Sequence, residues 1–174
     1  MPGFQEYAVS FRVRHPTADP MRIARRLAWT AHRFWKVGEA RKDGAGRPLP
    51  GVYRDSYCSF RLATARQTSL PVMLEVVLTH LVKRRALLLD LKKSGARLTL
   101  WVAVYVTTPS GDEIDAYAAR QFGELGVGFA VSVSPFRMPA YERKADNVVK
   151  VARRRTKGVG KRTLPRRKSV SAAE

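Results

Sequence analysis

Three histidines and one cysteine are the residues of this chain whose types could support acid–base, metal or nucleophilic chemistry. His15, His32 and His80 fall at a predicted strand end, in a loop and on a helix, without the H-x-x-x-H or H-E-x-x-H spacing of metal sites. Cys58 lies in an apolar and aromatic segment, where a buried, inert thiol is several times more common than a nucleophile. We therefore expect no catalytic residue, no metal and no cofactor.

The carboxylates do not change this expectation. Asp112, Glu113 and Asp115 cluster at the predicted start of a helix, where negative charge interacts favourably with the helix dipole without any metal. The glycines after residue 122 do not form a G-x-G-x-x-G pattern behind a strand, so a dinucleotide site is not expected either. The sequence does not indicate an enzyme.

One segment combines aromatic and basic residues. Residues 33–39 read RFWKVGE, and two tyrosines follow after a predicted loop. These side chains could form a stacking platform for bases with cationic neighbours. The alternative is that Phe34 and Trp35 fill the core beneath a loop while the basic residues are merely solvated. The candidate surface comprises Arg33, Trp35, Lys36, Tyr53 and Tyr57.

Charge is the most pronounced feature of the composition. The 174 residues include 33 lysines and arginines against 14 acidic residues, which gives a formal net charge of +19 and a pI of about 11.0. Such an excess indicates an anionic partner, either nucleic acid or an acidic protein, and does not bear on the fold.

About half of that charge lies in the last fifth of the chain. Residues 141–174 carry twelve basic and three acidic residues, with few large apolar side chains. We expect a domain over residues 1–140, followed by a basic, largely disordered tail that binds nucleic acid non-specifically through its phosphates. The tail residues expected to do so are Arg143, Lys144, Lys150, Arg153, Arg154, Arg155, Lys157, Lys161, Arg162, Arg166, Arg167 and Lys168.

The elements that must position these residues follow from the hydrophobic pattern. Tyr7, Val9, Phe11 and Val13 alternate with polar or small residues, which predicts a strand with one buried face. The order of strands and helices favours an α+β, ferredoxin-like two-layer sandwich, with helices on one face of a mainly antiparallel sheet. The other predicted elements are helices at 20–29, 71–93 and 113–125 and strands at 34–37, 52–62, 98–107 and 127–133.

Several short motifs also occur in a familiar order. Ser10-Phe11-Arg12-Val13, Asp19-Pro20 with Ile23, Trp35-Lys36-Val37-Gly38-Glu39 and Ser56-Tyr57-Cys58-Ser59-Phe60 resemble the bacterial family catalogued as domain of unknown function 4279. The likeness covers roughly residues 7 to 135, so the basic tail lies outside it. This resemblance implies a small, non-catalytic bacterial domain and supplies no site residues.

These observations lead to one expectation and one alternative. We expect a non-catalytic accessory domain whose tail binds nucleic acid. The alternative is a protein-interaction module, of an immunity or scaffold type, that covers an acidic partner protein. The first 26 residues lack an apolar signal-peptide core, and the longest strongly apolar run, 98–106, is about half as long as a membrane helix. We therefore expect a cytoplasmic protein.

Overall fold

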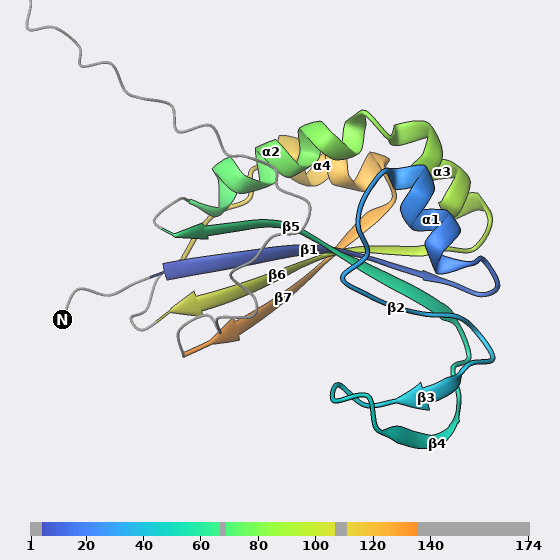
Figure 1. The fold of residues 1–174 in the computed structure, drawn as a ribbon. Coiled ribbons are helices and arrows are strands. Elements are labelled where there is room, and N and C mark those ends of the chain that lie inside the picture. Colours follow the sequence, from blue (N-terminus) through green and yellow to red (C-terminus); the bar gives the residue numbers. More distant parts are fainter. Residues whose placement is uncertain (1–4, 67–68, 107–110, 136–174) are drawn as a thin grey trace, which may run out of the picture.

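The computed structural model describes residues 5–66, 69–106 and 111–135. Five strands form one sheet in the order β2-β5-β1-β6-β7 (Figure 1). All neighbouring pairs in it are antiparallel except β6 and β7, which are parallel. Its strands are β1 (Gln5–His15), β2 (Arg33–Trp35), β5 (Ser56–Arg66), β6 (Arg97–Val106) and β7 (Val127–Ser134).

The helices of the described chain lie on one face of this sheet, and a small hairpin projects on the opposite side (Figure 1). This arrangement confirms the predicted α+β class with a mainly antiparallel sheet. The hairpin pairs β3 (Ala40–Lys42) with β4 (Pro48–Val52). The helices are α1 (Pro20–Leu27), α2 (Leu70–Val82), α3 (Arg85–Lys93) and α4 (Ala116–Glu124).

The core lies between the sheet and the helices. The alternate residues of β1 that were predicted to be buried, from Tyr7 to Val13, are at most 1% exposed. They belong to the same apolar cluster as Leu74, Val77 and Leu81 of α2. Because successive side chains of a strand point to opposite faces, the residues between them must lie on the face that the helices leave uncovered.

The bounds predicted for the strand at 52–62 were wrong. Residues 48–52 form β4 of the hairpin, and the sheet strand β5 begins only at Ser56. Gly51 has a φ of 84°, a left-handed conformation that glycine adopts without a steric penalty, and it lies inside β4. Asp55 then accepts a salt bridge from Arg14 of β1 at 3.1 Å. The chain therefore turns between two sheets where the sequence pattern indicated one strand.

The single helix predicted at 71–93 was also wrong, because the chain forms α2 and α3 with a break at residues 83 and 84. Arg84 is the residue between the two helices with φ −115° and ψ 14°. Its guanidinium donates to the carbonyl oxygen of Leu27 at 2.8 Å and to that of His80 at 2.9 Å, and it lies over the ring of Trp29. The break thus satisfies the last carbonyl of α1, a tertiary contact that periodicity does not encode.

The basic tail predicted at 141–174 lies outside the described residues. Within the described ranges, no helix is both long enough and apolar enough to cross a membrane.

Replacing Arg84 with alanine should lower the free energy of unfolding by about 2 kcal/mol, because two charge-assisted hydrogen bonds to partly buried carbonyls are lost. The neighbouring Arg85 is a matched control, since its ion pair with Glu124 is long, at 3.7 Å, and exposed. Arg85→Ala should cost less than about 1 kcal/mol. Urea denaturation of both variants measures the difference, and equal losses would refute the role assigned to Arg84.

Candidate nucleic-acid interface

The uncovered face of the sheet carries a concentration of arginine and aromatic side chains. The backbone register places them in three rows that run across the strands. The first row is Trp35, Tyr57, Arg14 and Arg97, the second is Arg33, Ser59, Arg12 and Thr99, and the third is Arg61, Ser10, Trp101 and Ala130. In the second and third rows small residues alternate with long ones, which leaves space between the long side chains.

That space forms two adjoining hollows of about 370 Å³ each. Both are lined by Arg12, Arg33, Tyr57 and Trp101, so they constitute one depression, which we call the open-face groove. Among the described residues, neither hollow has an aspartate or a glutamate in its lining. The remaining cationic lining residues are Arg14, Arg61 and Arg97.

Aromatic rings hold three of these guanidinium groups. The guanidinium carbon of Arg12 lies 3.8 Å from the ring centroid of Trp101. Arg14 and Arg33 lie farther from their rings, at 5.4 Å from Tyr57 and 5.5 Å from Trp35. A cation over an aromatic face is stabilised by the ring quadrupole and keeps its full charge. The rings therefore fix the orientation of these guanidinium groups, and Arg14 also pairs with Asp55.

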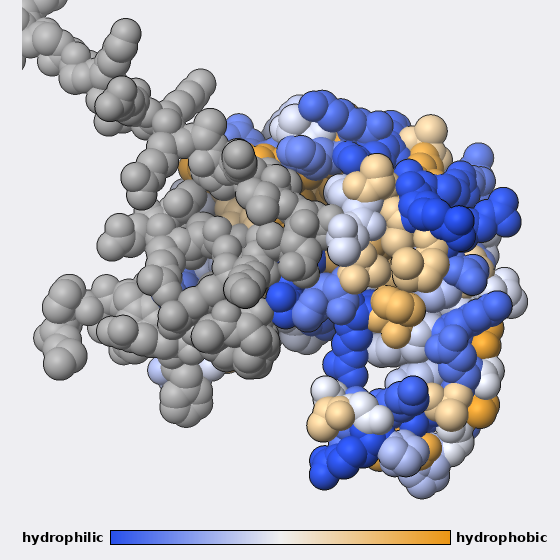
Figure 2. Space-filling model, in the orientation of Figure 1, coloured by the Kyte–Doolittle hydropathy of each residue, from blue (hydrophilic) through white to orange (hydrophobic). Residues whose placement is uncertain are grey.

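A three-ring stack connects this face to the hairpin. Trp35 lies between Tyr53 and Tyr57, with centroid distances of 4.6 Å and 4.2 Å and nearly parallel planes. The hydroxyl of Tyr53 accepts from the backbone N–H of Lys42 and donates to its carbonyl oxygen, which fixes β3. In the space-filling view the hairpin stands apart from the sheet as a separate lobe (Figure 2). The stack is thus the support of that lobe, and both faces of the Trp35 ring are occupied by protein.

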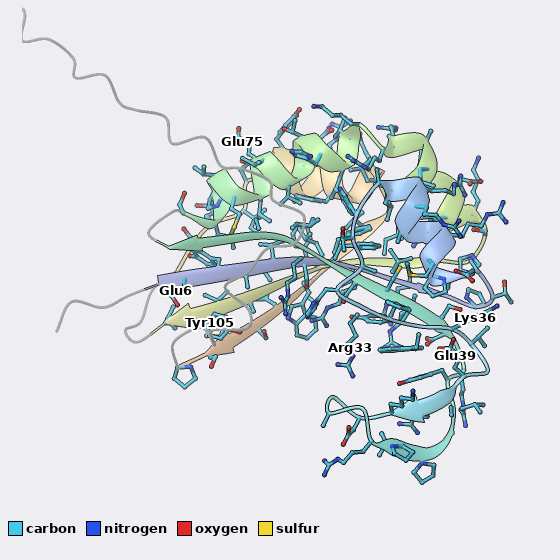
Figure 3. The ribbon with its side chains drawn as sticks, viewed as in Figure 1. Glu6, Arg33, Lys36, Glu39, Glu75 and Tyr105 are labelled. Carbon is cyan, nitrogen blue, oxygen red and sulfur yellow. The ribbon has the colours of Figure 1, made fainter. Side chains whose placement is uncertain are left out.

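Four of the five residues of the predicted aromatic and basic surface come together. Arg33, Trp35, Tyr53 and Tyr57 are linked by the ring contacts above. Figure 3 shows Arg33 projecting from the sheet on the side of the hairpin, and Lys36 beyond it near Glu39, in the turn before β3. Lys36 is exposed, does not line the groove, and donates its backbone N–H to the Glu39 carboxylate at 2.9 Å.

The alternative interpretation of this segment is correct for its basic residues, since Arg33 and Lys36 are exposed, but not for its aromatic residues. Phe34 does not fill the core beneath a loop, because 52% of its surface is exposed. Trp35 is half-buried, but in the stack on the uncovered face and not in the core cluster. Its indole Nε1 is buried without a hydrogen-bond partner among the described residues.

Sequence reasoning missed Arg12, Arg14, Arg61, Arg97 and Trp101 as members of the site. Arg12 and Arg14 could have been found, because the alternation of residues in β1 already places both on the polar face of that strand. The other three join them only through the register of β5 and β6 against β1. The sequence does not encode that register locally.

The residues considered for catalysis do not converge. His15 is buried at the end of β1, where its Nδ1 accepts from the backbone N–H groups of Thr17 and Ala18. His32 receives a hydrogen bond from Arg61 on the uncovered face, whereas Cys58 is fully buried on the opposite face of the same sheet. These histidines and the thiol have separate surroundings, and we assign them no chemistry.

The helix layer differs electrostatically from the groove. Some of its basic residues pair with carboxylates: Arg26 pairs with Asp90 at 2.8 Å, and Arg120 pairs with Glu124 at 2.9 Å. Arg85 approaches Glu124 as well. Ion pairs thus occur on the helix layer, whereas the described lining of the groove contains no aspartate or glutamate.

Comparison with known proteins gave no further indication: no family model, no curated protein and no solved structure matches this chain. The resemblance to the family of unknown function therefore stays a prediction from the sequence.

Removing the central ring of the stack should detach the hairpin. Trp35→Ala is expected to lower the free energy of unfolding by about 2 kcal/mol and to make residues 40–52 susceptible to limited proteolysis. The adjacent Phe34→Ala is the control, because that ring is half exposed and lies outside the stack and the core cluster. Equal protease resistance of the two variants would contradict the role of the stack.

The Cys58 thiol should be unreactive in the folded protein. Burial raises its pKa to about 12, so hardly any thiolate, the reactive form, exists at pH 8. An unfolded cysteine, with a pKa of about 8.5, is substantially ionised at that pH. Labelling with a thiol reagent at pH 8 should be at least about 100-fold slower in native buffer than in denaturant. Comparable rates would show that the thiol is accessible and ionised.

Proposed function

We propose that this protein is a non-catalytic nucleic-acid-binding protein that contacts phosphates through its open-face groove and through the basic segment 141–174. The observation that carries the proposal is the groove: five arginines from four strands meet on one sheet face, and no carboxylate is found among the described lining residues. The charge of the whole chain, +19, supports the same conclusion.

The physical basis of such binding is counterion release. Each arginine or lysine that neutralises a phosphate releases a condensed cation, so affinity is independent of base sequence and falls steeply with salt. The twelve basic residues of segment 141–174 would supply most of these contacts. The groove would add contacts at a fixed geometry, because its guanidinium groups are held over aromatic rings.

The proposal includes the finer description of the fold and the location. Strands β5 and β6 are parallel with β1 between them, and α2 and α3 connect them, which is a split β-α-β unit of the ferredoxin-like type. The parallel pair formed by β6 and β7 is an addition to that unit. We propose a ferredoxin-like relationship on this basis, membership of the bacterial family of unknown function on the sequence motifs, and a cytoplasmic location.

A second candidate function has one observation in its favour. The edge strand β7 exposes Val131 and Val133, at 56% and 68%. An apolar sheet edge suits a protein partner, as an immunity-type or scaffold module would require. A protein partner that remains attached after nuclease treatment would support this function in place of nucleic-acid binding.

Nucleic-acid binding should show a strong dependence on salt and on the basic segment. If six or more phosphates are contacted, the association constant for random-sequence DNA or RNA should fall about 1,000-fold between about 50 and 200 mM salt. A chain that ends at residue 140 should bind more weakly and with a shallower slope of log affinity against log salt. Fluorescence anisotropy at several salt concentrations measures both quantities.

Circular dichroism of the shortened chain is the control for folding. Absence of binding by the full chain at low salt would refute the proposed function. Binding whose salt slope is unchanged by the deletion would refute the part assigned to segment 141–174.

A further inference from the structure

We propose that the open-face groove is a site for a single strand of nucleic acid, in which bases stack within the groove and phosphates contact the surrounding arginines. This inference rests on the proposed function and adds to it a preference for unpaired strands. Three features of the groove support it: its concave shape, the aromatic rings among its arginines and the spacing of those arginines.

The shape of the groove selects for an unpaired nucleotide. Its two hollows of about 370 Å³ are joined by the four lining residues that they share, so the depression extends continuously across the strands. Small side chains such as Ser10, Ala103 and Ala130 are among the lining residues. A duplex presents its phosphates on a convex surface and keeps its bases paired, so it cannot place a base in these hollows. A single strand exposes its bases and can.

The groove contains a surface on which a base can stack. Trp101 lines both hollows, is partly exposed, and carries the Arg12 guanidinium 3.8 Å from its ring centroid. Unpaired bases stack on aromatic rings and also on guanidinium planes. Indole and guanidinium together thus provide a flat surface beside charged groups, a combination that a purely electrostatic phosphate site does not need.

The arginines are spaced along a path across the sheet. Arg33 lies on β2 and Arg97 on β6, three strand spacings away, which corresponds to about 14 Å. Both are exposed, and within the described part of the chain neither forms an ion pair. Arg12 and Arg14 of β1 lie between them. A short stretch of backbone crossing the strands would therefore contact cations at both ends and in the middle.

The stack of Trp35 with the two tyrosines limits where the strand can lie. Both faces of the Trp35 ring are covered by Tyr53 and Tyr57, so Trp35 cannot itself receive a base. It borders the hollow that also contains Arg97 and Thr99. We therefore assign base stacking to the Trp101 end of the groove, and to the Trp35 end a supporting role for the arginines.

The test compares a mixed-sequence DNA single strand with the duplex that it forms with its complement, using the full chain. The basic segment 141–174 should bind both, so the duplex serves as the reference for sequence-independent attraction. The full chain should bind the single strand more tightly than the duplex by about tenfold or more, since stacking acts on the single strand alone.

A pair of double variants separates the groove from general charge. Arg33→Gln with Arg97→Gln removes two charges from the groove, and Arg22→Gln with Arg25→Gln removes two from the exposed surface of α1. The groove variant should weaken single-strand binding about tenfold more than the α1 variant does and should lower the salt slope by about 1.4. The two variants should affect duplex binding equally.

Trp101 provides an uncharged test of stacking. Trp101→Ala should weaken single-strand binding at least about fivefold without changing duplex binding, and Trp101→Phe should retain most of the affinity because it keeps an aromatic face. Thermal unfolding of each variant verifies that the fold is intact, and the phenylalanine variant remains informative if the alanine variant does not fold.

The outcomes distinguish the two proposals. Equal affinity for single strand and duplex, together with equal effects of the two double variants, would overturn the groove as a single-strand site while leaving nucleic-acid binding in place. Failure of the full chain to bind either oligonucleotide at low salt would overturn the proposed function itself.

Discussion

The antiparallel pairing of β1 with both β5 and β6 is the constraint on which the rest of the structure depends. Once β1 is central, its alternation assigns Tyr7, Val9, Phe11 and Val13 to the helix layer and the residues between them to the other face. The same pairing brings the arginines of β5 and β6 beside those of β1. The core and the groove are therefore two consequences of one set of backbone hydrogen bonds.

A sheet that is covered on only one side must expose the other to water or to a partner. Here the exposed side is occupied by arginines stacked on indole and phenol rings, which cover the apolar surface of the rings while keeping their charge accessible. Neighbouring arginines on one face repel one another, and an anionic ligand placed between them would reduce that repulsion. This arrangement is the physical basis on which we propose that the groove binds an anionic ligand.

Much of the fold could be predicted from the sequence, because β1 and the apolar faces of the helices follow periodic patterns. The break at Arg84 could not, since it depends on a carbonyl of α1 that is distant in sequence. Four residues of the site could be predicted because they occur in short aromatic and basic runs: Arg33, Trp35, Tyr53 and Tyr57. Arg97 and Trp101 were missed because only the sheet register brings them there, and Lys36 was included on proximity in sequence alone.

The central claim, that the uncovered sheet face binds nucleic acid, is tested most directly by mapping the contacts. Backbone amide resonances of isotopically labelled full-length protein would be followed during titration with a single-stranded oligonucleotide. Within the folded domain, we expect the largest shifts at Arg12, Arg33, Arg97 and Trp101 and no shifts in the helix layer. Shifts confined to segment 141–174, or centred on α1 to α4, would contradict it.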